Sequence, residues 1–174
     1  MGTALVYGRG PKSLGEQLGV STQEAKGYIQ KYFSIYASIG AWLNNAADTA
    51  VRTRQCRTIG GRIRHFEFNW HDSAERSSAE REGKNTPIQG SNASMTKLAL
   101  YLIHVALDEL GYTDLGARIV NCIHDEICVE SPTDIAEEVG ALVKYKMEEA
   151  GAYFVHKVPI TAEMVIADTW AAKK

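Results

Sequence analysis

Three ionisable residues in a row, His124-Asp125-Glu126, stand between two apolar runs, and their types and position could support metal-dependent chemistry. The runs at 117–123 and 126–130 predict two strands, so the tripeptide lies at a tight turn on the edge of a sheet. Adjacent carboxylates repel each other, and a divalent cation relieves that repulsion. Magnesium is usually held by one or two protein carboxylates, substrate phosphates and water. Polar residues also populate ordinary hairpin turns, and the tripeptide alone favours that simpler interpretation.

A second group of polar residues recurs at a spacing of four: Arg81, Asn85 and Gln89. If helical geometry extends back across Pro87, all three side chains lie on one face of a helix. Arg, Asn and Gln can hydrogen-bond base edges and sugars, so this face could contact a nucleic acid. The alternative is a loop arginine, a turn asparagine and a capping glutamine.

The net charge of −2 conceals an asymmetry along the chain. Residues 1–91 carry 12 Lys and Arg against 8 Asp and Glu, whereas residues 92–174 carry 7 against 13. Five arginines of the first part occur with no acid among them: Arg52, Arg54, Arg57, Arg62 and Arg64. Such a block is a candidate phosphate-facing surface. A solvated basic face is the alternative interpretation.

The first third of the chain is predicted to be helical. Pro11 favours a short helix to Leu18, and Ser21 with Glu24 forms a capping-box pattern that begins a longer helix to about Ser38. Gly40 predicts a break before a further helix, at 41–54. Gly60-Gly61 between two alternating runs then predicts a β-hairpin over 56–67.

The remaining elements alternate between helix and strand. Residues 69–84 read as a polar loop with a possible helical piece, and Thr86-Pro87 predicts the start of a new helix. The expected elements after this loop are helix 86–110, strands 117–123 and 126–130, a helix from 131–133 to Gly151, and a half-buried strand over 158–166. Helices and an antiparallel sheet that segregate in this way predict an α+β fold.

Composition excludes several classes of protein. The apolar fraction is 45% and the charged fraction 23%, as in ordinary globular domains, and no run of 18 apolar residues could cross a membrane. The three cysteines form neither a disulfide framework nor a zinc-site spacing, so a reducing, cytoplasmic setting is expected.

Several motifs in one order resemble the C-terminal part of family A DNA polymerases, the bacterial DNA polymerase I type. The first three motifs are Tyr7-Gly8, Gly61-Arg62 and the stretch 81–91. The last two are the stretch 123–126, which contains the acidic tripeptide, and the strand that begins at Val158-Pro159, after which the chain ends near Trp170. The resemblance covers essentially the whole chain. It implies part of a right-hand polymerase fold, with a fingers-derived helical part at 1–55 and a palm-derived part at 56–174. The palm part would hold an antiparallel sheet backed by helices.

The resemblance also implies roles for single residues. Asp125 matches the catalytic aspartate of the palm hairpin, a ligand of the two magnesium ions, for which manganese is a possible substitute. Glu126 matches an adjacent acid with a lesser role, and His124 a residue near the primer terminus. Tyr7 matches the tyrosine beside the templating base, in contact with nucleotide and DNA, and Gly8 matches the nucleotide-site glycine that follows it.

The helical face and the hairpin would contact DNA. The resemblance assigns Arg81, Asn85 and Gln89 to the minor-groove side of the primer–template, and it places Arg62 on the DNA-binding surface as well. Contacts to the acceptors shared by all base pairs are nearly blind to sequence, as replication requires. The implied activity is template-directed addition of deoxynucleotides to a primer 3′ end, with dNTPs as substrates.

Two parts of the family pattern are missing from the sequence. The Asp-Tyr-Ser motif with the first metal-binding aspartate does not occur, nor does the fingers lysine that holds the triphosphate. We therefore expect a split polymerase whose N-terminal partner chain supplies both, or else a truncated fragment, and no activity without that half. The alternatives are a non-catalytic DNA-binding module derived from a polymerase and a relative of single-subunit RNA polymerases.

Overall fold

The computed structural model describes residues 10–172, so Tyr7 and Gly8 lie outside the described residues. Two compact units divide the chain after Gly90, and each unit is described by itself. This boundary differs from the 55/56 division expected from the sequence, because the hairpin and the first half of the long helix that follows it pack with the N-terminal helices. The assignment of either part to fingers or palm stays a prediction.

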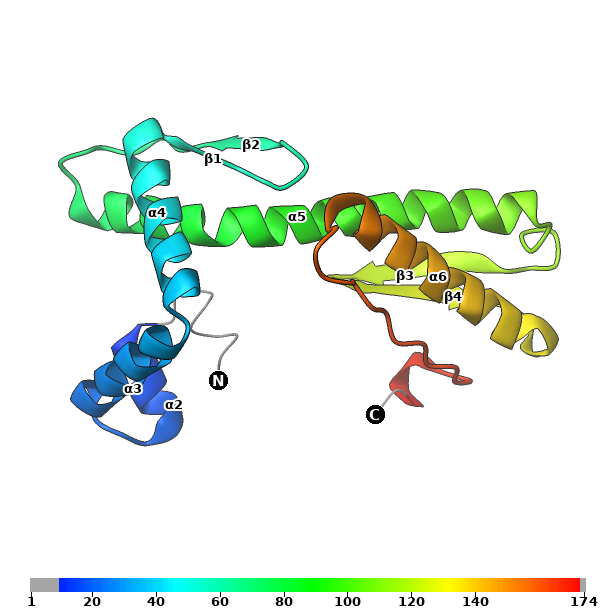
Figure 1. Ribbon diagram of the computed structural model, residues 1–174. Helices are drawn as coiled ribbons and strands as arrows, with labels where there is room; N and C mark the ends of the chain where they lie inside the picture. Colours follow the sequence, from blue (N-terminus) through cyan, green and yellow to red (C-terminus); the bar gives the residue numbers. More distant parts are fainter. Residues whose placement is uncertain (1–9, 173–174) are drawn as a thin grey trace. The chain divides into compact units, whose positions relative to one another are not determined.

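The first unit begins with three helices, α2 (Pro11–Leu18), α3 (Thr22–Ile35) and α4 (Ala37–Thr53) (Figure 1). The predicted capping box is confirmed: Ser21 Oγ accepts from Glu24 N at 3.2 Å, and Glu24 Oε2 accepts from Ser21 N at 3.0 Å. The break between α3 and α4 falls at Tyr36 and not at Gly40. Gly40 lies inside α4, where an added Cβ would approach the Phe33 ring to 3.2 Å, so close packing explains this glycine.

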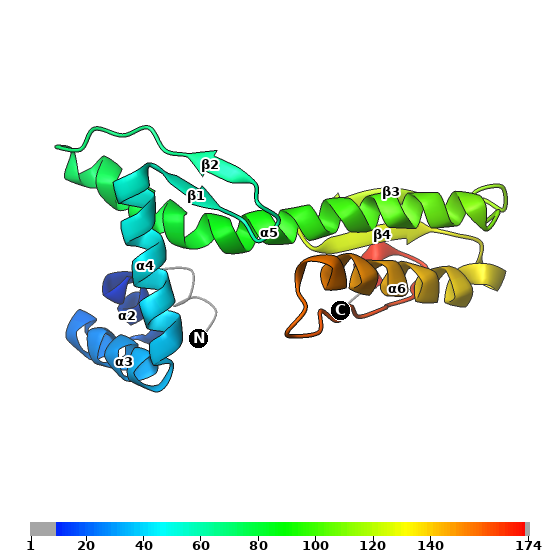
Figure 2. The ribbon, with the colours of Figure 1, turned by 45° about the horizontal axis from the view of Figure 1, so that its top comes forward.

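The predicted glycine hairpin is present as β1 (Gln55–Arg57) and β2 (Ile63–His65). The two strands are antiparallel, with Gln55 opposite His65. Gly61 adopts φ 82° in the connecting turn, a conformation that favours glycine. Figures 1 and 2 both place this hairpin beside the first half of α5 (Ser73–Glu109).

Helix α5 departs from two expectations of the sequence. It begins at Ser73, inside the predicted loop, because Asp72 caps it: Asp72 Oδ1 accepts from the backbone N–H groups of Ala74 and Glu75 at 2.8 and 3.1 Å. It also continues through Pro87, which was predicted to start a new helix. Proline removes one helical hydrogen bond, and the packing along the helix compensates for that loss.

The second unit packs a hairpin and a helix against the second half of α5. Strands β3 (Arg118–Ile123) and β4 (Glu126–Glu130) are antiparallel with a bulge between Ile119 and Asn121. A 3-10 turn, η1 (Thr133–Ile135), leads into α6 (Ala136–Phe154). The shared core consists of small and branched apolar residues from all three parts: Ala99, Ile103, Leu107, Ala117, Val139 and Ala150.

The strand predicted at 158–166 forms no ladder in the described structure. The segment is extended, and its apolar alternation packs against helix α6 instead of a neighbouring strand. An added Cβ at Gly151 would come within 2.5 Å of Ile160, and one at Gly140 within 2.6 Å of Met164 Sδ. After this segment a short turn, η2 (Trp170–Ala172), ends the described chain. Within residues 10–172 no helix is long and apolar enough to span a membrane.

Candidate active site

A two-residue turn presents the acidic motif. His124 and Asp125 connect β3 to β4, and the flanking residues Ile123 and Glu126 are paired across the hairpin. His124 has φ 56°, and Asp125 does not share this positive value. A side chain in this conformation costs on the order of 1 kcal/mol, which the rest of the hairpin must supply. The result is an exposed aspartate at the tip of a hairpin that packs on the core through Ile119, Ile127 and Val129.

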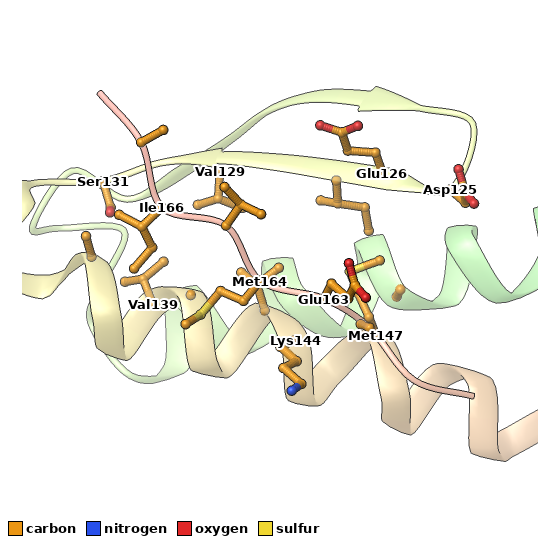
Figure 3. A pocket seen from close by; sticks show the side chains of 18 of the residues that line it. Asp125, Glu126, Val129, Ser131, Val139, Lys144, Met147, Glu163, Met164 and Ile166 are labelled. Atoms are coloured by element: carbon orange, nitrogen blue, oxygen red, sulfur yellow. The ribbon is translucent and has the colours of Figure 1, made fainter. Parts of the chain in front are cut away.

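The two neighbouring carboxylates have different surroundings. Asp125 is exposed, whereas Glu126 is half-buried at the start of β4. Glu126 Oε1 accepts a hydrogen bond from Trp170 Nε1 at 3.0 Å, and Cys128 Sγ donates to the same oxygen at 3.6 Å. Asp125 lies in the turn and Glu126 is the first residue of β4, and Figure 3 shows their carboxylates at separate places.

A cavity of about 910 Å³ lies beside the acidic turn. Figure 3 shows that β4 and the extended C-terminal segment border it, and that α6 supplies part of its wall. Its lining is mixed: Val139, Met147 and Met164 are among the apolar residues, and Lys144 and Glu163 add charge. Asp125 and Glu126 stand at one end. All of these residues belong to the second unit.

The donor set at the turn fits a partial magnesium site. Among the described residues, no group of three or more His, Cys, Asp or Glu could hold a metal by itself. Magnesium needs no such cage, because one or two carboxylates suffice when substrate phosphates and water complete its shell. The exposed carboxylate of Asp125 can supply one hard oxygen ligand to a site of this kind.

The structure places the three spaced polar residues on one face of α5. Arg81, Asn85 and Gln89 all fall within one uninterrupted helix, four residues apart, in the first unit. Arg81 and Gln89 are exposed, and Arg81 Nη2 donates to Ser78 Oγ at 3.4 Å. Asn85 is half-buried, and its Oδ1 is a buried oxygen with no hydrogen-bond partner among the described residues. An amide in this state has unused bonding capacity toward a ligand.

The arginine block divides into structural and available members. Arg64 forms an ion pair with Glu82, donates to Thr86 Oγ1 at 3.2 Å, and joins the hairpin to α5. Arg54 lies over the Phe68 ring at 4.8 Å. Arg62, at the hairpin turn, has an exposed side chain, while its backbone N–H donates to Thr58 Oγ1 at 3.1 Å. These roles could not be separated from the sequence, because all five arginines occur in one basic stretch without acids.

Sequence reasoning missed one residue at the acidic turn. Trp170 contacts Glu126 across 44 residues of chain, and only folding of the C-terminal segment over the sheet unites them. A lone tryptophan near a chain end carries no local signal of that contact.

Comparison with known proteins shows the family to which this chain belongs. The family model described as DNA polymerase family A matches residues 3–172. The chain belongs to DNA polymerase family A. DNA polymerase I of Thermus thermophilus is 32% identical over 171 residues, which are 98% of this chain and 20% of the relative. The Deinococcus radiodurans enzyme is 32% identical over 95% of this chain and 17% of its own length.

A phage relative and a solved structure agree with this lineage. The DNA polymerase of Bacillus phage SP01 is 32% identical over 93% of this family A chain and 18% of its own. The solved polymerase domain of Pol1 from M. smegmatis, in complex with DNA primer-template and dNTP, has a TM-score of 0.77 and 32% identity. The match covers 85% of this chain and 26% of the M. smegmatis chain. The predicted α+β fold, a partial family A polymerase fold, is therefore confirmed. The chain spans about a fifth of the length of the relatives it matches.

Proposed function

We propose that this chain is the C-terminal part of a DNA-directed DNA polymerase that adds deoxynucleotides to a primer 3′ end. The observation that carries the proposal is the position of Asp125, which is exposed at the tip of the β3–β4 turn beside a cavity. It occurs in a chain that matches family A from residue 3 to 172. That the chain acts as one subunit of a split enzyme is part of the same proposal.

The catalytic role falls on the turn at 124–126. Asp125 would provide an oxygen ligand to magnesium, or to manganese in its place, and Glu126 would be an auxiliary acid. Bound in pairs, such ions neutralise the charge that develops on the attacking and leaving oxygens of phosphoryl transfer. His124, exposed in the same turn, would lie near the primer terminus. The protein's own contribution is to hold one carboxylate at a fixed place for in-line displacement.

Binding of the primer–template would use the polar face of α5 and the first hairpin. Arg81 and Gln89 are exposed on that face, and the half-buried Asn85 lies between them in sequence. Arg62 would contact a backbone phosphate from the hairpin turn. Tyr7 and Gly8, which lie outside the described residues, would contact the incoming dNTP and the templating base.

A partner chain would complete the site. It would bring the Asp-Tyr-Ser strand with the first metal-binding aspartate and the fingers lysine for the triphosphate. The cavity supports this partner, because β4 and the extended segment at 160–168 both border it and form no ladder with each other. A strand inserted there would find an unpaired edge on β4 and apolar side chains beneath.

Primer extension tests the proposal. The purified chain alone should incorporate no nucleotide at any magnesium concentration, since it encodes only one of the two aspartates. Addition of a polypeptide with the preceding part of a family A polymerase should restore incorporation. Robust extension by the chain alone would contradict the need for a partner. Binding of primer–template without incorporation in the mixture would favour a non-catalytic DNA-binding module, and use of ribonucleotides would favour an RNA polymerase relative.

We also propose a cytoplasmic location, in a bacterium or in the host of a phage. The relatives that support this location come from bacteria and from a bacteriophage. Fractionation of expressing cells would test it.

A further inference from the structure

The carboxylate of Glu126 is tied to the far end of the chain. Trp170 Nε1 donates to Glu126 Oε1 at 3.0 Å, between residues 44 positions apart. The Trp170 ring remains 63% exposed, so burial of the ring cannot explain its orientation. The hydrogen bond is a directional contact that brings η2 to the acidic turn.

The turn needs such a restraint. Although the turn is short, His124 carries a positive φ, and the side chain of Asp125 makes no hydrogen bond that the described structure records. Asp125 precedes Glu126 by one peptide bond, so a fixed Glu126 side chain limits the rotations that would swing Asp125.

We propose that Trp170 is a positioning residue for the metal-binding turn, which acts through Glu126 to hold Asp125 in one orientation. The catalytic consequence rests on the proposed polymerase function, whereas the restraint itself does not. The hydrogen bond would draw Glu126 toward η2 and leave Asp125 as the ligand at the tip. This arrangement would make the two adjacent acids unequal in the reaction.

The restraint can be measured on the 174-residue chain alone by NMR. In ¹⁵N-labelled chain, the Trp170 indole resonance, assigned by its loss in Trp170→Phe, should shift when Glu126 is changed to Ala. Glu163→Ala is the matched control, because Glu163 is an acid that lines the same cavity. The resonance should not shift in this variant, since the indole N–H of Trp170 donates to Glu126 and not to Glu163. An indole resonance that ignores Glu126→Ala would overturn the proposal.

The same spectra separate positioning from a general structural role. Trp170→Phe removes the N–H donor and keeps a smaller aromatic ring at this exposed position. We expect the amide resonances of residues 124–126 to show new conformational exchange, while those of α6 and the melting temperature stay unchanged. Unaltered dynamics at the turn would contradict the proposal, as would a loss of structure throughout the second unit.

The kinetic consequence is tested in the mixture that reconstitutes primer extension. Trp170→Phe should lower kcat about tenfold with an unchanged KM for primer–template, since a hydrogen bond to a charged group contributes roughly this factor. In a Glu126→Ala background the same change should have no further effect, because Trp170 acts through Glu126. The control Trp70→Phe, in the first unit, should leave both parameters unchanged.

Each outcome has one meaning. An equal loss on Trp170→Phe in both backgrounds would refute the action through Glu126. If the wild-type mixture incorporates nothing, the proposed function fails, and the NMR result still decides whether Trp170 holds the turn.

Discussion

The two hairpins of this protein have tips of opposite character. The turn between β1 and β2 contains Gly61 at φ 82° and the exposed cation Arg62. The turn between β3 and β4 contains only His124 and Asp125, and it exposes an acid. The same secondary structure thus displays a positive charge in one unit and a negative charge in the other.

The difference is consistent with the roles proposed for the two tips, a phosphate contact at Arg62 and a metal ligand at Asp125. A phosphate contact tolerates movement, because charge attraction falls off gradually with distance, and a glycine turn provides such freedom. A metal ligand must stay within a few tenths of an ångström, and the second turn has the shorter loop and the tether to Trp170. Under the proposed roles, the tip that would bind a metal is also the one with the shorter turn and the additional hydrogen bond.

The largest expected effect is at the acidic tip. Asp125→Ala should reduce nucleotide incorporation by the reconstituted enzyme about a thousandfold, because loss of a metal ligand removes several kcal/mol of transition-state stabilisation. Glu126→Ala should cost much less. Single-turnover primer extension measures both, with the melting temperature as a control for folding. Equal losses for the two acids, or none, would refute the assignment of Asp125.

The basic tip and the α5 face should give smaller effects on binding. Arg81→Ala and Gln89→Ala should each weaken primer–template binding about tenfold on every template sequence, whereas Arg62→Ala should mainly lower the salt dependence. Fluorescence anisotropy at several salt concentrations separates the two patterns. Lys31→Ala on α3 is the matched control. A strong change of base preference at one template position would contradict minor-groove contact by Arg81 and Gln89.

The packing beneath the first hairpin can be weakened at one glycine. A Cβ at Gly83 would lie 2.3 Å from Ala50 Cβ, so Gly83→Ala should force α4 away from α5 and cost about 1–3 kcal/mol of unfolding free energy. Gly27→Ala, where nothing lies within 4 Å of the new atom, should instead stabilise α3 by up to about 1 kcal/mol. Denaturant titrations measure the unfolding free energy of both variants. Equal changes in the two variants would mean that α4 and α5 are not in close contact.

A cysteine in each hairpin allows a comparison that leaves the fold intact. Cys56 in β1 is 8% exposed, and burial raises the pKa of its thiol, so less thiolate is present at any given pH. Cys122 in β3 is exposed. Alkylation at pH 8, followed by peptide mass spectrometry, should modify Cys122 first and Cys56 only at higher pH or after unfolding. Equal rates would indicate that the first hairpin opens readily.

Local signals predicted much of the fold. The capping box at Ser21 and the turn glycine Gly61 act within a few residues, and the structure confirms the elements they predicted. The start of α5 at Ser73 also had a local signal, since Asp72 is a strong N-cap residue, but the polar composition of 69–84 obscured it. The roles predicted for the acidic turn and the α5 face stay predictions.

The sequence by itself determined most of the helices, both hairpins and the charge at each hairpin tip, because capping, turn chemistry and periodicity depend on near neighbours. Only the tertiary structure decided three matters: the passage of α5 through Pro87, the packing of residues 158–166 on α6 without a strand partner, and the hydrogen bond from Trp170 to Glu126. Each depends on groups distant in sequence, whose contacts outweigh local preference once packing brings them within a few ångströms.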